Sequence, residues 1–343
     1  MIFFAKKQIG KQTVFFENPP SFAGFACAVG KREGDGPLRD FFDYISDDSF
    51  YGEKTWELAE SAMQKMALSM ALDKAGLPPS AVDCVFAGDL LNQCIGSSFG
   101  LRDLGIPYWG VYGACSTMSE SLALASMAID GGFADAAAAV TSSHFCSAER
   151  QFRFPLEYGG QRTPSSQWTV TGAGAAVLTV SGNGPYITHV TNGKIVDMGV
   201  TDVNNMGAAM APAAYDTLSA HFRDTGVDPN YYDLIVTGDL ASIGSSILID
   251  SFKNDGIDLA PVHNDCGLMI FSREDQDVLS GGSGCGCPAS VLTGYLLSEM
   301  KSGHLNRILF AATGAMLSTV SSQQGGSIPS ICYAVSISNT RRG

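Results

Sequence analysis

Two apolar octets with nearly the same pattern lie far apart along the chain. Asp83–Leu90 has the sequence DCVFAGDL and Asp233–Leu240 has the sequence DLIVTGDL, with Asp, Gly, Asp and Leu at the same places. A short apolar run that ends in Gly-Asp predicts a buried strand followed by a turn. Because an internal repeat governs the whole architecture, this one is the first guide to the fold.

A helical pattern precedes each octet, over Thr55–Ala75 and Ala213–Thr225. Each stretch is followed by a glycine, Gly76 or Gly226. Glycine is the usual residue at the left-handed position that closes a helix, so both stretches are predicted to end there.

A second pair of segments extends the repeat. Residues 113–140, GACSTMSESLALASMAIDGGFADAAAAV, resemble residues 285–312, CGCPASVLTGYLLSEMKSGHLNRILFAA. In both, a glycine-rich turn opens a helix, the helix ends in glycine (Gly132 or Gly303), and an apolar strand follows. This order predicts a duplicated α/β fold, with mixed, parallel-rich sheets packed in layers. We expect two similar halves, residues 1–181 and 182–343.

Composition and charge narrow the possible functions. The 343 residues include 34 Asp and Glu against 21 Lys and Arg, a net charge of −13, and 45% are hydrophobic. Such a chain is neither disordered nor suited to neutralising the phosphates of a nucleic acid. Only 16% of residues are charged, so part of the surface is expected to be covered by a second subunit, most simply in a homodimer.

The sequence predicts an intracellular protein without a membrane span. The apolar stretch at Met1–Phe4 is too short for a signal peptide, and no run reaches the ~20 apolar residues of a spanning helix. The 9 cysteines are odd in number, which favours reduced thiols over a disulfide framework. No further Cys or His pair accompanies Cys285 and Cys287, so no metal site of the chain's own is expected.

Cys115 is the strongest candidate for chemistry. The segment Gly113–Thr117 (GACST) follows the apolar stretch Tyr108–Tyr112 and opens the helix of the first half. Small neighbours allow a sharp turn, and a thiol at a helix N-terminus is stabilised as thiolate. The alternative is a small buried cysteine with no chemical role, since free cysteine is among the most buried residue types.

The motifs along the whole chain resemble a known family. The GACST turn within two repeated halves resembles the thiolase superfamily of acyl-transfer and condensing enzymes. From about residue 10 to the C-terminus, longer motifs look like the stage V sporulation protein AD family: GDLLNQ (88–93), GACSTMSES (113–121), TSSHFCSAERQFRFPLEYGGQR (141–162), TVTGAGA (169–175), MGAAMAPAAYDT (206–217), HNDCGLMI (263–270) and GGSGCGC (281–287).

The resemblance implies a thiolase-like fold in which catalysis is disfavoured. Thiolases place His or Asn on the loop that here contains Asp239, and His on the glycine-rich turn where this chain has Cys287. An ionised Asp accepts hydrogen bonds and would oppose a developing oxyanion. We therefore expect a protein that is not an enzyme; the alternative is an acyltransferase or condensing enzyme with Cys115 as nucleophile.

The same resemblance implies a ligand and a place in the cell. The family is associated with dipicolinic acid (pyridine-2,6-dicarboxylate) and with a membrane assembly that moves it into the developing spore. This implies partner proteins in that assembly and a location at the cytoplasmic face or periphery of the forespore inner membrane. The candidate ligand-binding residues, expected to converge at one sheet edge, are Asp89, Asn92, Gln93, Cys115, Ser142, Ser143, His144 and Cys287.

Several of these residues have structural alternatives. Ser142 and Ser143 suit caps of their own backbone, His144 suits a structural hydrogen bond, and Asp89 suits a turn because Asp239 repeats it. Arg150, Arg153 and Arg162 rank second as carboxylate-binding groups.

Calcium is expected to bind together with the ligand rather than as a cofactor of the protein. A chain of charge −13 repels a free dianion, whereas the calcium chelate is neutral and has coordination positions that Asp89 suits. The hypothesis is that the chelate binds better than the free acid. A purely structural protein with a vestigial pocket remains the third interpretation.

Overall fold

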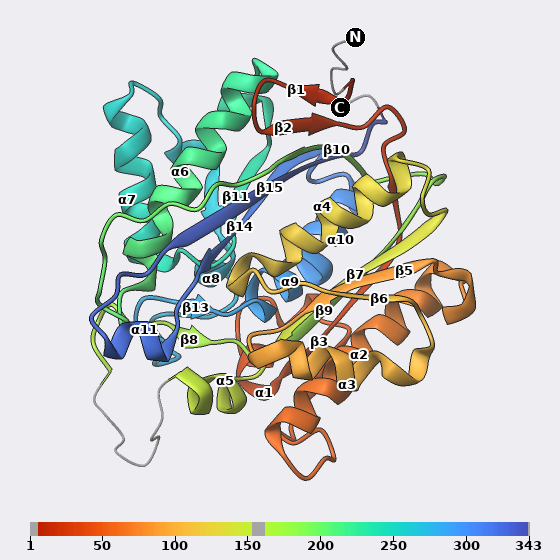
Figure 1. Cartoon of the computed structure of the whole chain (residues 1–343), viewed down its shortest axis with the longest axis horizontal. Helices are drawn as coiled ribbons and strands as arrows, with labels where there is room; N and C mark the ends of the chain where they lie inside the picture. Colours follow the sequence, from red (N-terminus) through yellow and green to blue (C-terminus); the bar gives the residue numbers. More distant parts are fainter. Residues whose placement is uncertain (1–5, 153–161, 342–343) are drawn as a thin grey trace.

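The strands form two half-sheets with the same internal order. The computed structural model describes residues 6–152 and 162–341 (Figure 1). From the centre outward, the first half-sheet contains β3 (Ser21–Gly30), β9 (Gly172–Thr179), β7 (Ala136–Ser143), β5 (Cys84–Gly88) and β6 (Tyr108–Gly110). The second contains β10 (Tyr186–Thr191), β15 (Ser330–Ser338), β14 (Arg307–Ala315), β11 (Leu234–Thr237) and β12 (His263–Asp265).

Strand directions confirm the duplication. In each half the two outermost pairs are parallel, β7–β5–β6 and β14–β11–β12, and the next pair inward is antiparallel, β7–β9 and β14–β15. The half-sheets join through one residue pair, Tyr186 with Ser21. The sheet is therefore mixed, as predicted, and nearly divided in two.

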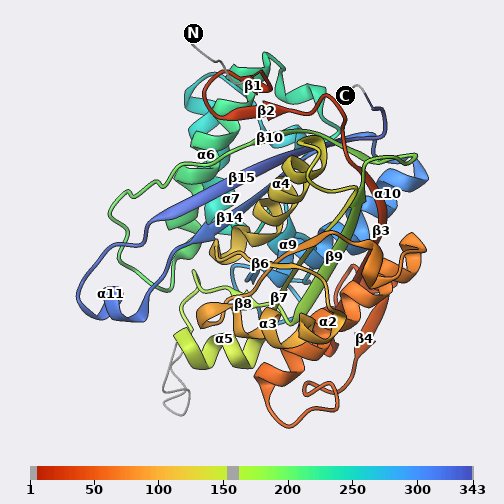
Figure 2. The same ribbon diagram turned by 45° about the vertical axis from the view of Figure 1, so that its right-hand side comes forward.

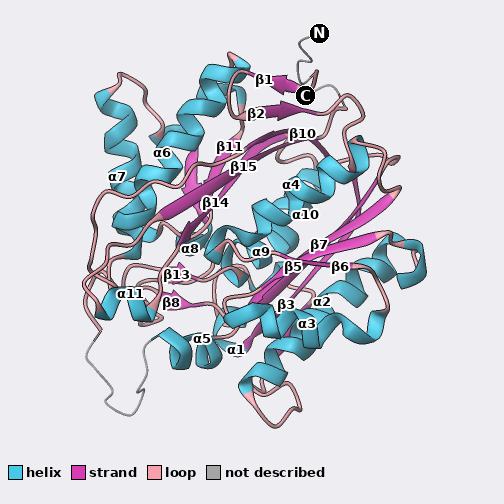
Figure 3. Ribbon diagram, viewed as in Figure 1, coloured by secondary structure: helices cyan, strands magenta, loops and turns pink. Residues whose placement is uncertain are grey.

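Helices cover both outer faces and fill the space between the half-sheets (Figures 2 and 3). Helices α2 (Trp56–Ala75) and α3 (Ile95–Leu101) lie outside the first half-sheet, and α6 (Met206–Thr225) and α7 (Ala241–Asn254) outside the second. Between them lie α4 (Thr117–Asp130) and α9 (Gly286–Val291), which continues through a π-helical turn into α10 (Leu297–Ser302). The result is the layered α/β fold that the repeat predicted.

Smaller elements complete the chain. They are β1 (Gln8–Ile9), β2 (Thr13–Phe15), α1 (Lys31–Gly34), β4 (Tyr44–Ser46), α5 (Phe145–Phe152), β8 (Trp168–Thr169), α8 (Cys266–Met269), β13 (Gly282–Ser283) and α11 (Thr319–Gln323). The hairpin β1–β2 pairs with β10 of the second half-sheet, so residues 8–15 lie on the second half.

The helix-closing glycines are confirmed, and one predicted helix is longer than expected. Gly76 and Gly226 close α2 and α6 in the left-handed conformation. Helix α6 begins at Met206 instead of Ala213, even though Pro212 interrupts its hydrogen bonding. Asn205 caps this earlier start, and burial of the side chains from Ala209 to Ala211 holds the first turns in place.

Three apolar clusters follow from the layers. One lies beneath α2, one beneath α6 and α7, and the largest fills the space around α4 and α9. On α4, Leu122 is fully buried in this central cluster, whereas Leu124 is 37% exposed. None of the described helices combines the length and apolar character that a bilayer span requires.

The central layer supplies a prediction. Leu122→Ala should lower the free energy of unfolding by about 2–5 kcal/mol, because it leaves a cavity between the half-sheets. Leu124→Ala removes the same atoms from the same helix and should cost under about 1 kcal/mol. Urea unfolding measures both, and equal losses would contradict the proposed central position of α4.

Candidate functional site

The Cys115 turn is the sharpest feature of the first half. Ala114 has a φ of 53°, the left-handed region that costs a non-glycine residue roughly 1–2 kcal/mol. The hydroxyl of Ser116 donates to the carbonyl of Gly113 (2.7 Å), and that of Thr117 donates to the carbonyl of Ala114 (2.6 Å). These bonds hold the strained turn and place Cys115 just before α4, as the sequence predicted.

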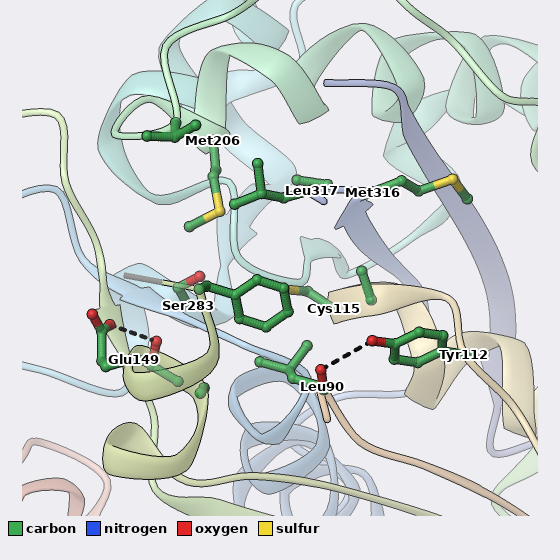
Figure 4. Close-up of a pocket in the computed structure, with 14 residues that line it drawn as sticks. Leu90, Tyr112, Cys115, Glu149, Met206, Ser283, Met316 and Leu317 are labelled. Carbon is green, nitrogen blue, oxygen red and sulfur yellow. Dashed lines mark hydrogen bonds between the residues drawn. The ribbon is translucent and has the colours of Figure 1, made fainter. Parts of the chain in front are cut away.

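Cys115 lies at the wall of a cavity of about 280 Å³ (Figure 4). The lining is mostly apolar, and Tyr112, Glu149, Thr169 and Ser283 add polar groups. The hydroxyl of Tyr112 donates to the carbonyl of Leu90 (3.2 Å), and that of Thr169 donates to Glu149 (3.1 Å). Among the residues that the structure describes, the lining contains no Lys, Arg or His.

Asp239 lies beside Cys115 and reinforces the effect of burial on the pKa of its thiol. Its carboxylate accepts hydrogen bonds from the Gly284 amide (3.0 Å), the Ser283 hydroxyl (3.3 Å) and the Thr313 hydroxyl (3.1 Å). Burial, reinforced by the charge of Asp239, raises the pKa of the Cys115 thiol well above its usual value. The thiol is therefore neutral, the opposite of the thiolate that a helix N-terminus alone would favour.

Two further cysteines come from the second half. Cys285 packs with Cys115, Leu90 and Ala148, and its thiol donates to the carbonyl of Ser142 (2.9 Å). Cys287 is the repeat counterpart of Cys115, but its thiol is buried against the carbonyl of Gly238 (3.7 Å) and is not part of the cavity lining. Cys285, not the predicted Cys287, is the neighbour of Cys115.

Asp89 lies away from the cavity, in the turn role that its repeat partner suggested. It is fully buried and accepts hydrogen bonds from the amide of Leu91 (2.9 Å) and from the amide and hydroxyl of Ser97 (2.7 and 2.6 Å). Its carboxylate is thus occupied in holding the loop that leads into α3, and the structure does not bring it to Cys115.

Ser142, Ser143 and His144 are also engaged in the protein interior. The two serines are the last residues of β7 rather than the loop after it. Ser142 donates to Glu60 (3.1 Å), and Ser143 donates to the carbonyl of Val170 (2.7 Å). A ring nitrogen of His144 lies 2.8 Å from the carbonyl oxygen of Ser49, and burial lowers its pKa. None of the three lines the Cys115 cavity.

Asn92 and Gln93 belong to a different surface. Asn92 lines a second cavity of about 350 Å³ together with Glu57 and Arg150, which form an ion pair. Gln93 is exposed. Of the other second-rank arginines, Arg162 pairs with Asp277 (2.7 Å), and Arg153 lies outside the described residues.

Much of the cavity wall was not anticipated. Val203 lies just before α6 and Met206 begins it. Ala315, Met316 and Leu317 come from the end of β14 and the residues after it. Figure 4 shows Met206 and Leu317 opposite Cys115 across the cavity. Apolar residues of this kind have no local signal, because only the packing of the two halves brings them to Cys115.

Comparisons with known proteins establish the family. Residues 10–338 match the family model described as stage V sporulation protein AD (SpoVAD). The chain belongs to this family. It is 45% identical to the stage V sporulation protein AD of Bacillus subtilis (strain 168) over 329 residues, which cover 96% of this chain and 97% of that protein.

Solved structures outside the family share only the fold. A variant of OleA from Xanthomonas campestris superposes with a TM-score of 0.59 at 16% identity, covering 94% of this chain and 99% of the other. For 3-oxoacyl-[acyl-carrier-protein] synthase III from Aquifex aeolicus VF5 the TM-score is 0.56 at 14% identity, with 93% and 99% covered. The predicted thiolase-like fold is confirmed.

This SpoVAD family member carries several buried carboxyl groups around its site. Burial raises the pKa of Asp239 to about 7 and that of Asp265 to about 6. Burial and the nearby Asp89 raise the pKa of Glu60 to about 8, and burial raises that of Glu33 to about 7. Burial also lowers the pKa of His221 to about 3 and that of His263 to about 4, so these groups oppose the carboxyls below about pH 6.5. Between about pH 6.5 and pH 8 the raised carboxyls give the folded chain more bound protons than the unfolded chain, so its stability falls as the pH rises.

Thermal unfolding tests this direction. The melting temperature should be higher at about pH 6.5 than at about pH 8.5, because alkaline pH forces buried carboxyls to ionise. Glu60→Gln, which keeps an acceptor for Ser142 and Ser147, should flatten this dependence. Glu53→Gln, at an exposed position, should leave it unchanged. A melting temperature that rises toward alkaline pH would refute the assignment.

Proposed function

We propose that this SpoVAD family member is a non-catalytic protein that binds dipicolinate in the Cys115 cavity and serves its passage into the developing spore. The observation that carries the proposal is the position of Asp239, an acceptor of hydrogen bonds, beside Cys115 at the wall of the cavity. The cavity is present, but the His and Asn groups expected to activate the thiol in thiolases are replaced. A fold can keep its cavity without keeping the chemistry of related enzymes.

The size and walls of the cavity suit a single aromatic ring. A volume of about 280 Å³ lies at the lower end of small-molecule sites. Leu90, Phe152 and Leu317 offer apolar contacts to the faces of a planar ring. Tyr112 and Ser283 would donate to its polar edge by turning their hydroxyls away from the Leu90 carbonyl and Asp239. These contacts favour a compact, flat ligand over a long chain.

Charge favours the calcium chelate over the free dianion. Among the described residues, the cavity wall contains the carboxylate of Glu149 and no cationic side chain. A bare dianion would lose its hydration without gaining a countercharge, whereas the chelate is neutral overall. The calcium-binding role that the sequence suggested for Asp89 is not assigned to a side chain in this proposal, because Asp89 is occupied in its turn and Glu149 accepts a hydrogen bond from Thr169.

The second candidate function is acyl transfer through Cys115. The left-handed Ala114 favours it, because strained turns are common at nucleophiles. Asp239 opposes it, since it raises the pKa of the thiol and offers an acceptor where an oxyanion needs donors. We rank this function below ligand binding.

Calorimetric titration distinguishes the candidates. The protein should bind dipicolinate with calcium roughly tenfold more tightly or better than without it. Cys115→Ala should retain binding within a few-fold, because the thiol contributes contact rather than chemistry. Equal affinities with and without calcium would contradict the hypothesis that the calcium chelate is the preferred ligand. An acyl group on Cys115 after incubation with acyl-CoA, detected by mass spectrometry, would favour acyl transfer.

The proposal includes a second copy of the chain and partners at the forespore inner membrane. Strand β6 ends the sheet order, and among the described residues it pairs with β5 alone, so one of its backbone edges is unpaired. Tyr108, Trp109 and Tyr112 on and after this strand are 39%, 62% and 52% exposed. An aromatic edge strand is suited to pairing with its own copy, and Tyr112 would extend the contact to the cavity wall.

The oligomeric state tests the dimer. Trp109→Lys should convert a dimer to a monomer in light-scattering measurements, because it places a charge at the centre of the contact. Phe133→Lys, at an 87% exposed position outside this edge, should remain dimeric. A wild-type monomer at micromolar concentration would contradict the proposal.

A further inference from the structure

A cleft lined by three cations lies between the β1–β2 hairpin and the end of α6. Its volume is about 580 Å³, and Lys11, Lys194 and Arg223 line it together with Gly10, Gln12 and Asp224. Lys11 comes from the turn between β1 and β2, Lys194 follows β10, and Arg223 lies in the last turn of α6. Figures 1 and 2 show the hairpin beside the end of α6.

The floor of the cleft is a fixed structure. The carboxylate of Asp224 accepts hydrogen bonds from the amide of Gln12 (3.0 Å) and from the amide and hydroxyl of Thr13 (3.2 Å each). The Thr13 hydroxyl continues to Thr191 (2.9 Å), and Thr191 to a ring nitrogen of His221 (2.7 Å). This buried chain fixes the hairpin against α6, so the positions of the cationic groups above it are set by the fold.

The cations project outward while the acids are engaged within. The side chain of Asp224 is 3% exposed and lies 3.4 Å from Arg223, whose own side chain is 60% exposed. Lys194 is 58% exposed and pairs with Asp216 at 2.9 Å. Lys11 is exposed. Three cations against these two carboxylates leave a positive site on a chain whose net charge is −13.

We propose that this cleft binds a phosphate group. Three cations that approach from three separate segments match a tetrahedral anion with several oxygens better than a carboxylate, which offers two. Arginine also supplies paired donors for phosphate oxygens. The same chemistry is presented by free phosphate, by a phosphate ester and by the headgroup of an anionic phospholipid.

Binding measurements with the full chain in phosphate-free buffer test the site and distinguish the sources of its phosphate group. The probes are inorganic phosphate, followed by calorimetry, and phosphatidylglycerol vesicles, followed by cosedimentation with phosphatidylcholine vesicles as reference. A triple variant, Lys11→Gln, Lys194→Gln and Arg223→Gln, should weaken binding of at least one probe roughly tenfold or more. The matched variant Lys54→Gln, Lys65→Gln and Arg102→Gln, at cations of the first half, should bind like wild type.

Each outcome decides the proposal. Loss of phosphate binding in the cleft variant supports the site with a soluble phosphate source, and loss of phosphatidylglycerol binding supports it with a lipid source. Equal behaviour of the cleft and matched variants overturns it, as does wild-type protein that binds neither probe. The proposal is also overturned if the cleft binds poly-aspartate but neither phosphate probe, a result that would favour an acidic polypeptide as the ligand. Circular dichroism confirms that both variants remain folded.

Discussion

Burial of α4 and α9 between two half-sheets is the constraint on which the site depends. A helix covered on both sides must be apolar over most of its surface, and the central cluster contains Met118, Leu122 and Ile129 of α4 with Ala289 and Val291 of α9. Because both helices run through one layer, their first turns meet. This encounter brings the Cys115 turn of the first half against Asp239, Ser283 and Cys285 of the second.

The same burial changes the chemistry of the groups that meet there. A thiol at a helix N-terminus tends toward thiolate, yet desolvation and a carboxylate at the same place favour the neutral form of Cys115. Asp239 is itself held by three donors and has a pKa near 7. With Glu33 and Glu60 also raised, the formal charge of −13 overstates the charge of the folded protein near neutral pH.

The sequence predicted the fold well because the features that specify it lie within short segments of each half. The Asp-Gly-Asp-Leu octets, the closing glycines and the position of Cys115 each depend on a few neighbouring residues. The rest of the site depends on long-range packing. Ser142 and Ser143 suit a loop or a buried strand equally well, and Met206 and Leu317 look like ordinary core residues until the two halves are assembled. Asp89 lies in a turn, which the sequence already offered as an alternative, whereas its repeat partner Asp239 lies beside Cys115.

The joint between the halves has a topological consequence. The half-sheets share one paired position, Tyr186 with Ser21, whereas β2 pairs over several residues with β10 of the second half. The boundary between the repeats in sequence is therefore not the boundary in space: a fragment that starts at residue 182 would lack the strand that covers β10. Strand β15 and the β1–β2 hairpin both pair with β10 (Figures 1 and 2). A circular permutant that joins the old ends and opens between the repeats would keep β2 covalently attached to the half on which it packs.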